Sequence, residues 1–230
     1  MKNKIGLITK IYLVATSFCV LLFTLSASAA DQDLRSIFEQ RYQAWRSYIN
    51  KPEILSSCSM APYVKNKPYE DILALGVPAL PLIMEKVSDK GELKSIFMAR
   101  AAGKILKRKN WNEGDRIWIW WENGRQDIPK EVDQYVAAWQ EAKKRGDDKQ
   151  AAEALKKLEG VGILGLPHIV NKLGSGKHDL IAVISHMAGG AVGADASEEQ
   201  VKGWWMKDKA KWMMIDERPK AVPPIEKPTK

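Results

Sequence analysis

The chain has 230 residues, a formal net charge of +8 and only two cysteines. This length suits one ordinary domain or a short repeat array. The charge is typical of an ordinary soluble surface, although an anionic partner would also suit it. Because basic residues are dispersed among acidic ones, the composition argues against a nucleic-acid-binding protein.

Residues 1–29 are typical of an export signal. Three lysines come before an apolar run from Ile11 to Leu25, and Ala27-Ser28-Ala29 then fits the small-x-small rule for signal peptidase. The run is shorter than the roughly 20 residues of a spanning helix, which makes an uncleaved anchor the less favoured alternative. We therefore expect cleavage near Ala29-Ala30, an exported (periplasmic or extracellular) protein, and no membrane span in the mature chain.

Cleavage would leave Cys58 as the only cysteine, since Cys19 lies in the signal. An intramolecular disulfide is then excluded, and the thiol is buried, linked to another chain or reactive. No histidine or aspartate lies close to Cys58 in sequence, so burial is the prediction.

Residues 30–52 are predicted to hold an N-terminal amphipathic helix. Its apolar residues recur at the spacing of one helical face: Leu34, Ile37, Phe38, Tyr42, Trp45, Tyr48 and Ile49. Asp31 or Asp33 can cap its start, and Pro52 ends it. The following segment, up to Pro68, shows little periodicity and contains three prolines, which predicts a long loop.

Helical periodicity continues in shorter segments along the chain. It predicts helices over residues 69–75, 79–88, 93–107, 129–145, 147–160, 167–173 and 179–192. Ser197 and Gln200 form a capping box that begins another helix. Residues 110–127 alternate apolar side chains without a clear face, so a short helix and a short strand both remain open. Residues 217–230 combine four prolines with lysines, which predicts a disordered tail.

The same helical unit is present twice. Gly76 aligns with Gly162 and Pro81 with Pro167, both at an offset of 86 positions, and the matches continue in order to Trp120-Trp121 and Trp204-Trp205. In each copy the glycine ends one helix and the proline begins the next. Such a unit cannot bury its apolar face alone, so stacking of the two copies is expected.

Residues 75–83 resemble the turn and second helix of a HEAT repeat, and residues 100–105 resemble the alanine-rich start of the following unit. The second copy departs from this pattern, with Gly165 where the first has Ala79 and a weakening Gly189-Gly190 pair. The resemblance implies stacked antiparallel helix pairs that bind other macromolecules, and it implies no reaction.

The predicted fold class is therefore all-α, a short HEAT-like helical repeat array (α-solenoid) with an N-terminal amphipathic helix. Its units are residues 53–128, the first HEAT-like unit with a tryptophan-rich end, and residues 129–216, a helical hairpin with the second HEAT-like unit.

Two motifs suggest chemistry that their context does not support. Residues 160–165 match the G-x-G-x-x-G dinucleotide fingerprint, but a predicted helix precedes them where a strand is needed, so they are interpreted as a repeat turn. His178 and His186 are eight positions apart, whereas metal-binding helices space their ligands by three or four. No cofactor, metal site or catalytic residue is predicted.

The nine tryptophans are the strongest binding signal. Trp45 and Trp139 lie in helical stripes and are predicted core residues. The candidate binding residues lie beside charged side chains, where exposed rings can stack on sugars or anchor a protein: Trp118, Trp120, Trp121, Trp204, Trp205 and Trp212. Recurrence of a Trp-Trp pair in both units favours the alternative that these rings brace the repeat.

The function favoured by the sequence is a noncatalytic protein-binding or scaffold role outside the cytoplasm. Recognition of a cell-wall or extracellular polysaccharide through the tryptophans is the second hypothesis. An enzyme with an unrecognised site is the third.

Overall fold

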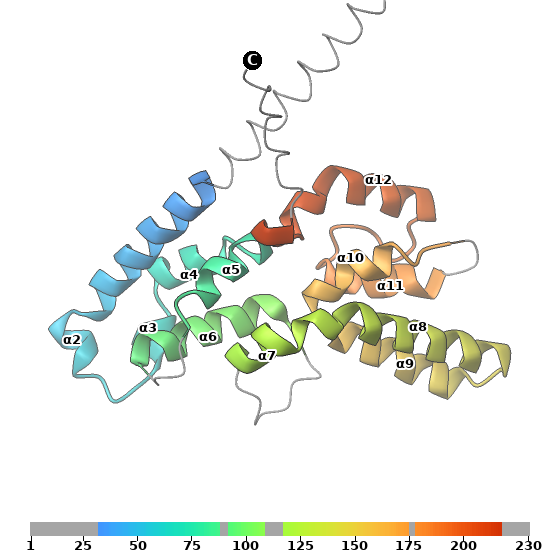
Figure 1. Ribbon diagram of the computed structural model, residues 1–230, viewed down its shortest axis with the longest axis horizontal. Coiled ribbons are helices and arrows are strands. Elements are labelled where there is room, and N and C mark those ends of the chain that lie inside the picture. Colours follow the sequence, from blue (N-terminus) through green and yellow to red (C-terminus); the bar gives the residue numbers. More distant parts are fainter. Residues whose placement is uncertain (1–31, 88–91, 109–116, 175–177, 218–230) are drawn as a thin grey trace, which may run out of the picture.

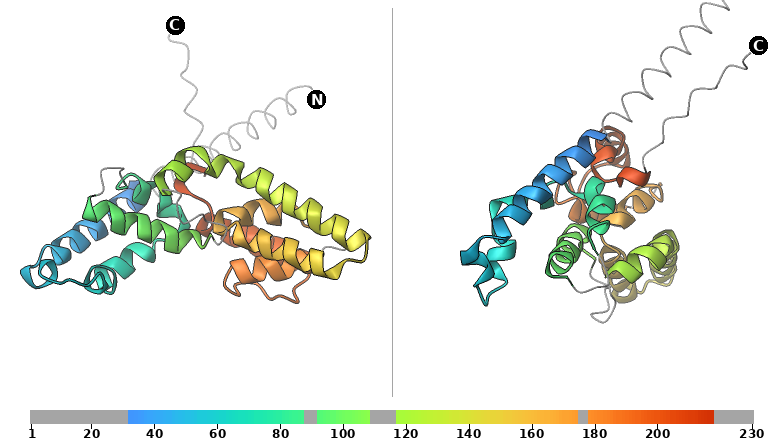
Figure 2. Two further views of the ribbon diagram at one scale, coloured as in Figure 1. Left: turned by 90° about the horizontal axis from the view of Figure 1, so that it is seen from below. Right: turned by 60° about the vertical axis from the view of Figure 1, so that its left-hand side comes forward.

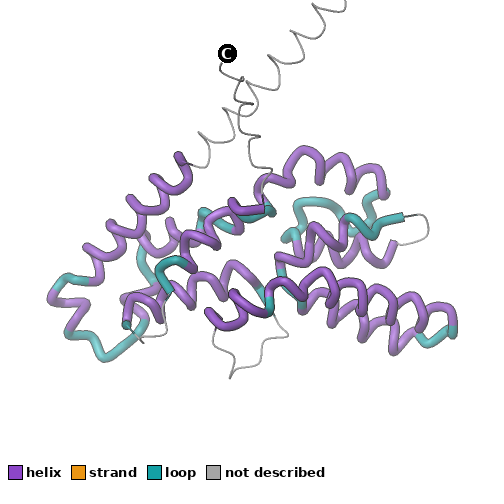
Figure 3. Tube along the Cα trace, in the orientation of Figure 1, coloured by secondary structure: helices purple, strands orange, loops and turns teal. Residues whose placement is uncertain are grey.

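The computed structural model describes residues 32–87, 92–108, 117–174 and 178–217. These ranges contain helices and no strand, which confirms the all-α class (Figures 1 and 3). None of the helices in these ranges is both long and apolar enough to cross a membrane. The predicted export signal and nearly all of the predicted tail lie outside the described residues.

The first described helix covers residues 32–49 and buries four side chains of its stripe: Phe38, Tyr42, Trp45 and Ile49. The Trp45 side chain has no exposed surface, and its indole N–H donates to the carbonyl of Tyr63 at 2.9 Å. Its ring also meets Phe97 edge-on, with the ring centroids 6.2 Å apart. Trp45 thereby joins this helix to Tyr63 and Phe97, which lie 18 and 52 positions after it in the sequence.

The predicted loop between this helix and Pro68 is wrong. The segment forms α2 (Pro52–Leu55) and α3 (Ala61–Val64), and α4 (Lys67–Leu73) begins before the segment ends. Each of these helices has a proline at its first or second position, where the missing N–H costs no hydrogen bond. The prolines therefore start short helices here and do not mark a loop. Cys58, between α2 and α3, is exposed, so its predicted burial is also wrong.

The first glycine turn leads into a packed helix pair. After Gly76 the chain forms the 3₁₀ turn η1 (Val77–Ala79), α5 (Leu80–Met84) and α6 (Leu93–Leu106), and α5 packs against α6. The ambiguous segment that follows contains α7 (Ile117–Asn123), which settles its described part as helix.

The C-terminal half begins with a helical hairpin. A short turn, η2 (Arg125–Asp127), leads into α8 (Ile128–Lys144), which runs beside α9 (Asp148–Gly160) (Figure 2). Then follow η3 (Ile163–Gly165), α10 (Leu166–Val170), α11 (His178–Met187), α12 (Glu198–Asp208), η4 (Lys209–Lys211) and η5 (Ile215–Glu217). The predicted capping box at Ser197 is present, with both of its hydrogen bonds.

One local conformation occurs twice at the predicted offset. Gly76 and Gly162 have φ values of 65° and 86°, and each is followed by a three-residue 3₁₀ turn and a five-residue helix. The bounds of these turns and helices differ by the same 86 positions. A single cluster of buried side chains runs through both halves of the described chain. The C-terminal end of α6 lies between the α2–α5 region and the α8–α12 region (Figure 1).

Candidate functional site

The two halves meet where α6 ends against the second glycine turn, a contact that we call the seam (Leu106–Arg108 with Val161–Ile163). A Cβ atom at Gly162 would lie 2.5 Å from the Leu106 carbonyl oxygen and 2.9 Å from the Cα of Arg108. Because α9 precedes the turn and ends at Gly160, the glycines lack the strand that dinucleotide binding needs. Gly162 instead lets the second glycine turn approach the backbone at the end of α6.

Lys107 has an unusual backbone at this contact. Its φ of 50° and ψ of 26° place it in the left-handed region, and it is the only non-glycine residue of the described ranges with a positive φ. Glycine or asparagine usually occupies this position after a helix, since other side chains are strained there. Strained backbone of this kind clusters at functional sites in proteins.

The Arg108 side chain contacts three other segments at the seam. One guanidinium nitrogen donates to both oxygens of Glu131 on α8, at 2.8 and 3.0 Å, and another donates to the Val161 carbonyl at 3.4 Å. The same guanidinium lies over the Trp120 ring, 5.0 Å from its centroid. Arg108 therefore connects the end of α6 to α7, α8 and the second glycine turn.

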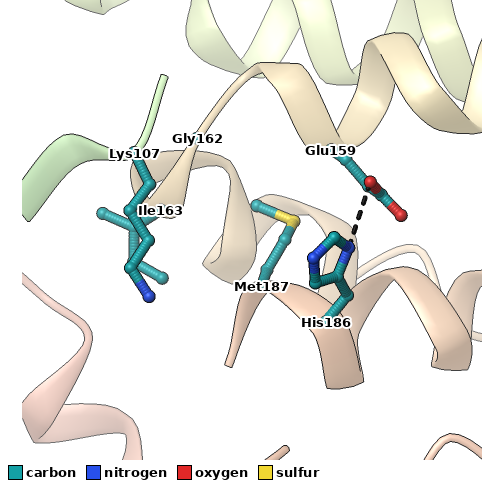
Figure 4. Close-up of a pocket in the computed structure, with 6 residues that line it drawn as sticks. All are labelled: Lys107, Glu159, Gly162, Ile163, His186 and Met187. Carbon is teal, nitrogen blue, oxygen red and sulfur yellow. Dashed lines mark ion pairs between the residues drawn. The ribbon is translucent and has the colours of Figure 1, made fainter. Parts of the chain in front are cut away.

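A small pocket opens on one side of the seam, between α9 and α11. Its volume is about 60 Å³, and six residues line it (Figure 4): Lys107, Glu159, Gly162, Ile163, His186 and Met187. The His186 Nδ1 lies 3.1 Å from a carboxylate oxygen of Glu159. Figure 4 shows the Lys107 side chain running beside Ile163, with its ammonium pointing away from this His–Glu pair.

A larger pocket, the seam pocket, shares Lys107 and Ile163 with the small pocket. It has a volume of about 290 Å³ and is lined by residues from five segments of the chain: Leu73, Gly76, Val77, Lys104, Ile105, Lys107, Ile163, Lys211 and Trp212. Apolar side chains form most of its wall, and its charged side chains are all lysines. This combination of an apolar wall and cationic side chains suits ligand binding.

A third pocket, of about 240 Å³, contains titratable groups between η2, α10 and η5. His168 and Glu217 both line it. Burial lowers the pKa of His168, and burial together with the neighbouring Asp216 raises the pKa of Glu217. Arg125 pairs with Asp216 at 3.5 Å and lies over the Trp121 ring at 4.4 Å. Within the described ranges, no group of three or more His, Cys, Asp or Glu residues is placed to hold a metal ion.

The candidate tryptophans lie in two separate places. Trp118, Trp120 and Trp121 are on α7, while Trp204 and Trp205 are on α12 and Trp212 follows η4; Figure 1 shows α7 and α12 apart. Trp121 and Trp205 each keep only 9% of their surface exposed, and the other four are half-buried. Trp204 lies 5.9 Å from Trp205 and 5.8 Å from Trp212 between ring centroids, so α12 and the residue after η4 form one three-ring cluster.

Sequence reasoning missed most of the seam pocket. Lys104 and Lys107 lie at the end of a predicted helix, and Trp212 is the one lining residue among the predicted binding residues. The basic run at the end of that helix was the available signal. This signal does not show the opposite wall of the pocket, because that wall is formed by the two glycine turns and by the segment after α12.

Comparison with known proteins gives no relative: no family model matches the chain, and no curated protein or solved structure matches it either.

Proposed function

We propose that this protein is exported and acts as a noncatalytic helical-repeat scaffold that binds a protein partner. The two glycine–proline turns with equal geometry support a short array of the HEAT-like kind, and the leader supports export. In such arrays the repeated helices serve as a rigid frame and the exposed helix faces carry the contacts.

The observation that carries this proposal is an exposed apolar stripe beside α3 and α6. Leu93 and Ile96 lie one turn apart on α6, and each keeps 44% of its surface exposed. Arg100, one turn further on, has a guanidinium nitrogen 3.5 Å from the sulfur of Met60, which is 53% exposed. Exposed aliphatic side chains grouped with Met and Arg are typical of a protein-binding surface.

The test is crosslinking and affinity capture of the tagged protein from its native envelope. The chain with Leu93→Asp and Ile96→Asp is compared with Met206→Asp, which changes another exposed apolar residue, on α12. A specific partner should be captured by the wild type and by Met206→Asp, and lost with the stripe variant. Capture that is equal for all three, or no specific partner at all, would contradict the proposal.

The export part of the proposal has its own measurement. The N-terminal sequence of the protein from the cell envelope or medium should begin near Ala30. A chain that retains residues 1–29 and stays with the membrane would instead support an uncleaved anchor.

Glycan binding is the second candidate, and the three-ring cluster of Trp204, Trp205 and Trp212 favours it. Trp204 and Trp212 are partly exposed, so the cluster can offer ring surface to a sugar. The deeply buried Trp121 and Trp205 are better placed to brace the helices. Glycan binding predicts saturable quenching of tryptophan fluorescence that Trp204→Ala reduces. A flat response across a broad glycan panel would exclude it.

A further inference from the structure

The seam pocket has two properties that together select a class of ligand. The first is its apolar wall, to which four segments contribute: Leu73 from α4, Val77 from η1, Ile105 from α6 and Ile163 from η3. Val77 and Ile163 are themselves buried, so their positions are set by the core behind the pocket. The wall is therefore preformed, which suits a small apolar group.

The second property is an excess of positive charge. Lys104, Lys107 and Lys211 line the pocket, and none of its lining residues is acidic. Lys211 is paired with Asp208 at 2.6 Å, and Lys104 lies 5.5 Å from the centre of the Tyr69 ring. No carboxylate of the described chain forms an ion pair with Lys104 or Lys107. Two ammonium groups beside an apolar wall attract an anion that can also fill the wall.

The backbone of Lys107 adds an independent observation. Glycine or asparagine would relieve its left-handed conformation, yet this position carries a long cationic side chain that extends beside Ile163 (Figure 4). The strained backbone at position 107 thus carries a side chain that places an ammonium group at the seam pocket. A volume of about 290 Å³ is close to the lower end of small-molecule sites, roughly 300–1,000 Å³.

We propose that the seam pocket binds a small amphipathic anion, with the apolar body against Val77, Ile105 and Ile163 and the anionic head between Lys104 and Lys107. The ligand bridges the first glycine turn, the end of α6 and the second glycine turn. Binding thus stabilises the contact between the two helical units. This site is distinct from the apolar stripe on α6 and does not depend on a protein partner.

The test uses the exported protein and four probes in calorimetric titrations. Octanoate carries both features, octanamide keeps the apolar body without the charge, and acetate keeps the charge without the body. Octyl phosphate tells a phosphate head from a carboxylate head. Saturable binding of octanoate, octyl phosphate or both is expected, with octanamide and acetate at least about tenfold weaker. The stronger of the two anions then identifies the head group.

Two double variants with equal loss of charge test the site. Lys104→Gln with Lys107→Asn should weaken binding of the preferred anion by about tenfold, since two partly exposed charge contacts are lost. Lys130→Gln with Lys144→Gln changes two exposed lysines of α8 and should leave affinity within about twofold. Asparagine suits the left-handed backbone at position 107, so the first variant should keep or raise the Tm and the lost affinity cannot be assigned to misfolding.

Three results would overturn the proposal. One is equal affinity for the preferred anion and for octanamide, which would show that charge plays no part. Another is unchanged binding by the Lys104→Gln, Lys107→Asn variant. The third is the absence of saturable binding for both amphipathic anions.

Discussion

Gly162 meets Leu106 backbone against backbone: a Cβ atom at Gly162 would lie 2.5 Å from the Leu106 carbonyl oxygen. A real Cβ does not approach another atom that closely, so no other residue fits here without movement of the seam. The equivalent glycine of the first unit, Gly76, has no such neighbour, because the nearest atom to its Cβ position is 3.9 Å away. The two turns share a conformation and differ in what packs on them.

This difference gives a matched pair of substitutions. Gly76→Ala should lower the free energy of unfolding by about 1–2 kcal/mol, the cost of a positive φ. Gly162→Ala should lower it by about 2–5 kcal/mol, because steric overlap adds about 1–3 kcal/mol to the same φ cost. Urea denaturation followed by circular dichroism measures both values. Equal losses of unfolding free energy for the two variants would show that the backbone at the seam moves to accommodate a Cβ atom at Gly162 at little cost.

Arg108 and Glu131 provide the second prediction. Their side chains are 9% and 22% exposed and share two contacts of 2.8 and 3.0 Å. Arg108→Met also removes the contacts with Val161 and Trp120 and should cost about 2–4 kcal/mol, whereas Glu131→Gln should cost about 1–2 kcal/mol. A double-mutant cycle should give a coupling energy of about 1–2 kcal/mol. Additive losses would mean that the ion pair contributes nothing to the seam.

Local signals in the sequence were sufficient to predict most helices. The stripe with Trp45 and that with Trp139 were predicted as core, and both side chains are buried. The Ser197–Gln200 capping box depends only on residues three positions apart and is present as predicted. Such features depend on residues that are close in sequence, so a single sequence is enough to predict them.

Features that depend on contacts between distant segments could not be predicted in this way. The conformation of Lys107 and the wall of the seam pocket arise from packing between α6, the second glycine turn and the segment after α12. The prolines of α2 and α3 were misread for another reason: Pro52 and Pro62 suit the first turn of a helix as well as a loop. Tertiary packing decides between those outcomes.

The capping box supplies the third prediction. The Ser197 hydroxyl accepts from the Gln200 N–H at 3.2 Å, and the Gln200 side chain accepts from the Ser197 N–H at 2.7 Å. Ser197→Ala should lower the free energy of unfolding by about 1 kcal/mol through α12. Ser47→Ala, an exposed change within the first described helix, is the control and should stay within about 0.5 kcal/mol of the wild type. Equal effects would show that α12 gains nothing from this cap.

Tyr69 gives a prediction about alkaline pH. Its side chain has no exposed surface, and its hydroxyl donates to the Phe97 carbonyl at 3.0 Å. Burial raises the pKa of Tyr69 to about 12, although the charge of Arg100 opposes the shift. The pKa in the unfolded chain is about 10. A raised folded pKa gives stability that is complete below pH 10 and is lost as the pH rises towards 12, because the unfolded chain releases the proton first.

Tyr69→Phe should therefore reverse its rank against the wild type as pH rises. At pH 7 the variant should be less stable by about 1 kcal/mol, because the hydrogen bond to Phe97 is lost. Between pH 10 and 12 the wild type alone loses a further 2–3 kcal/mol, approximately, from this phenol, since each pH unit is worth about 1.4 kcal/mol. The variant should then be the more stable protein at pH 12. Urea midpoints of both proteins at pH 7 and pH 12 measure this change of rank. A difference in stability that is the same at both pH values would show that the Tyr69 phenol does not keep its proton in the folded protein.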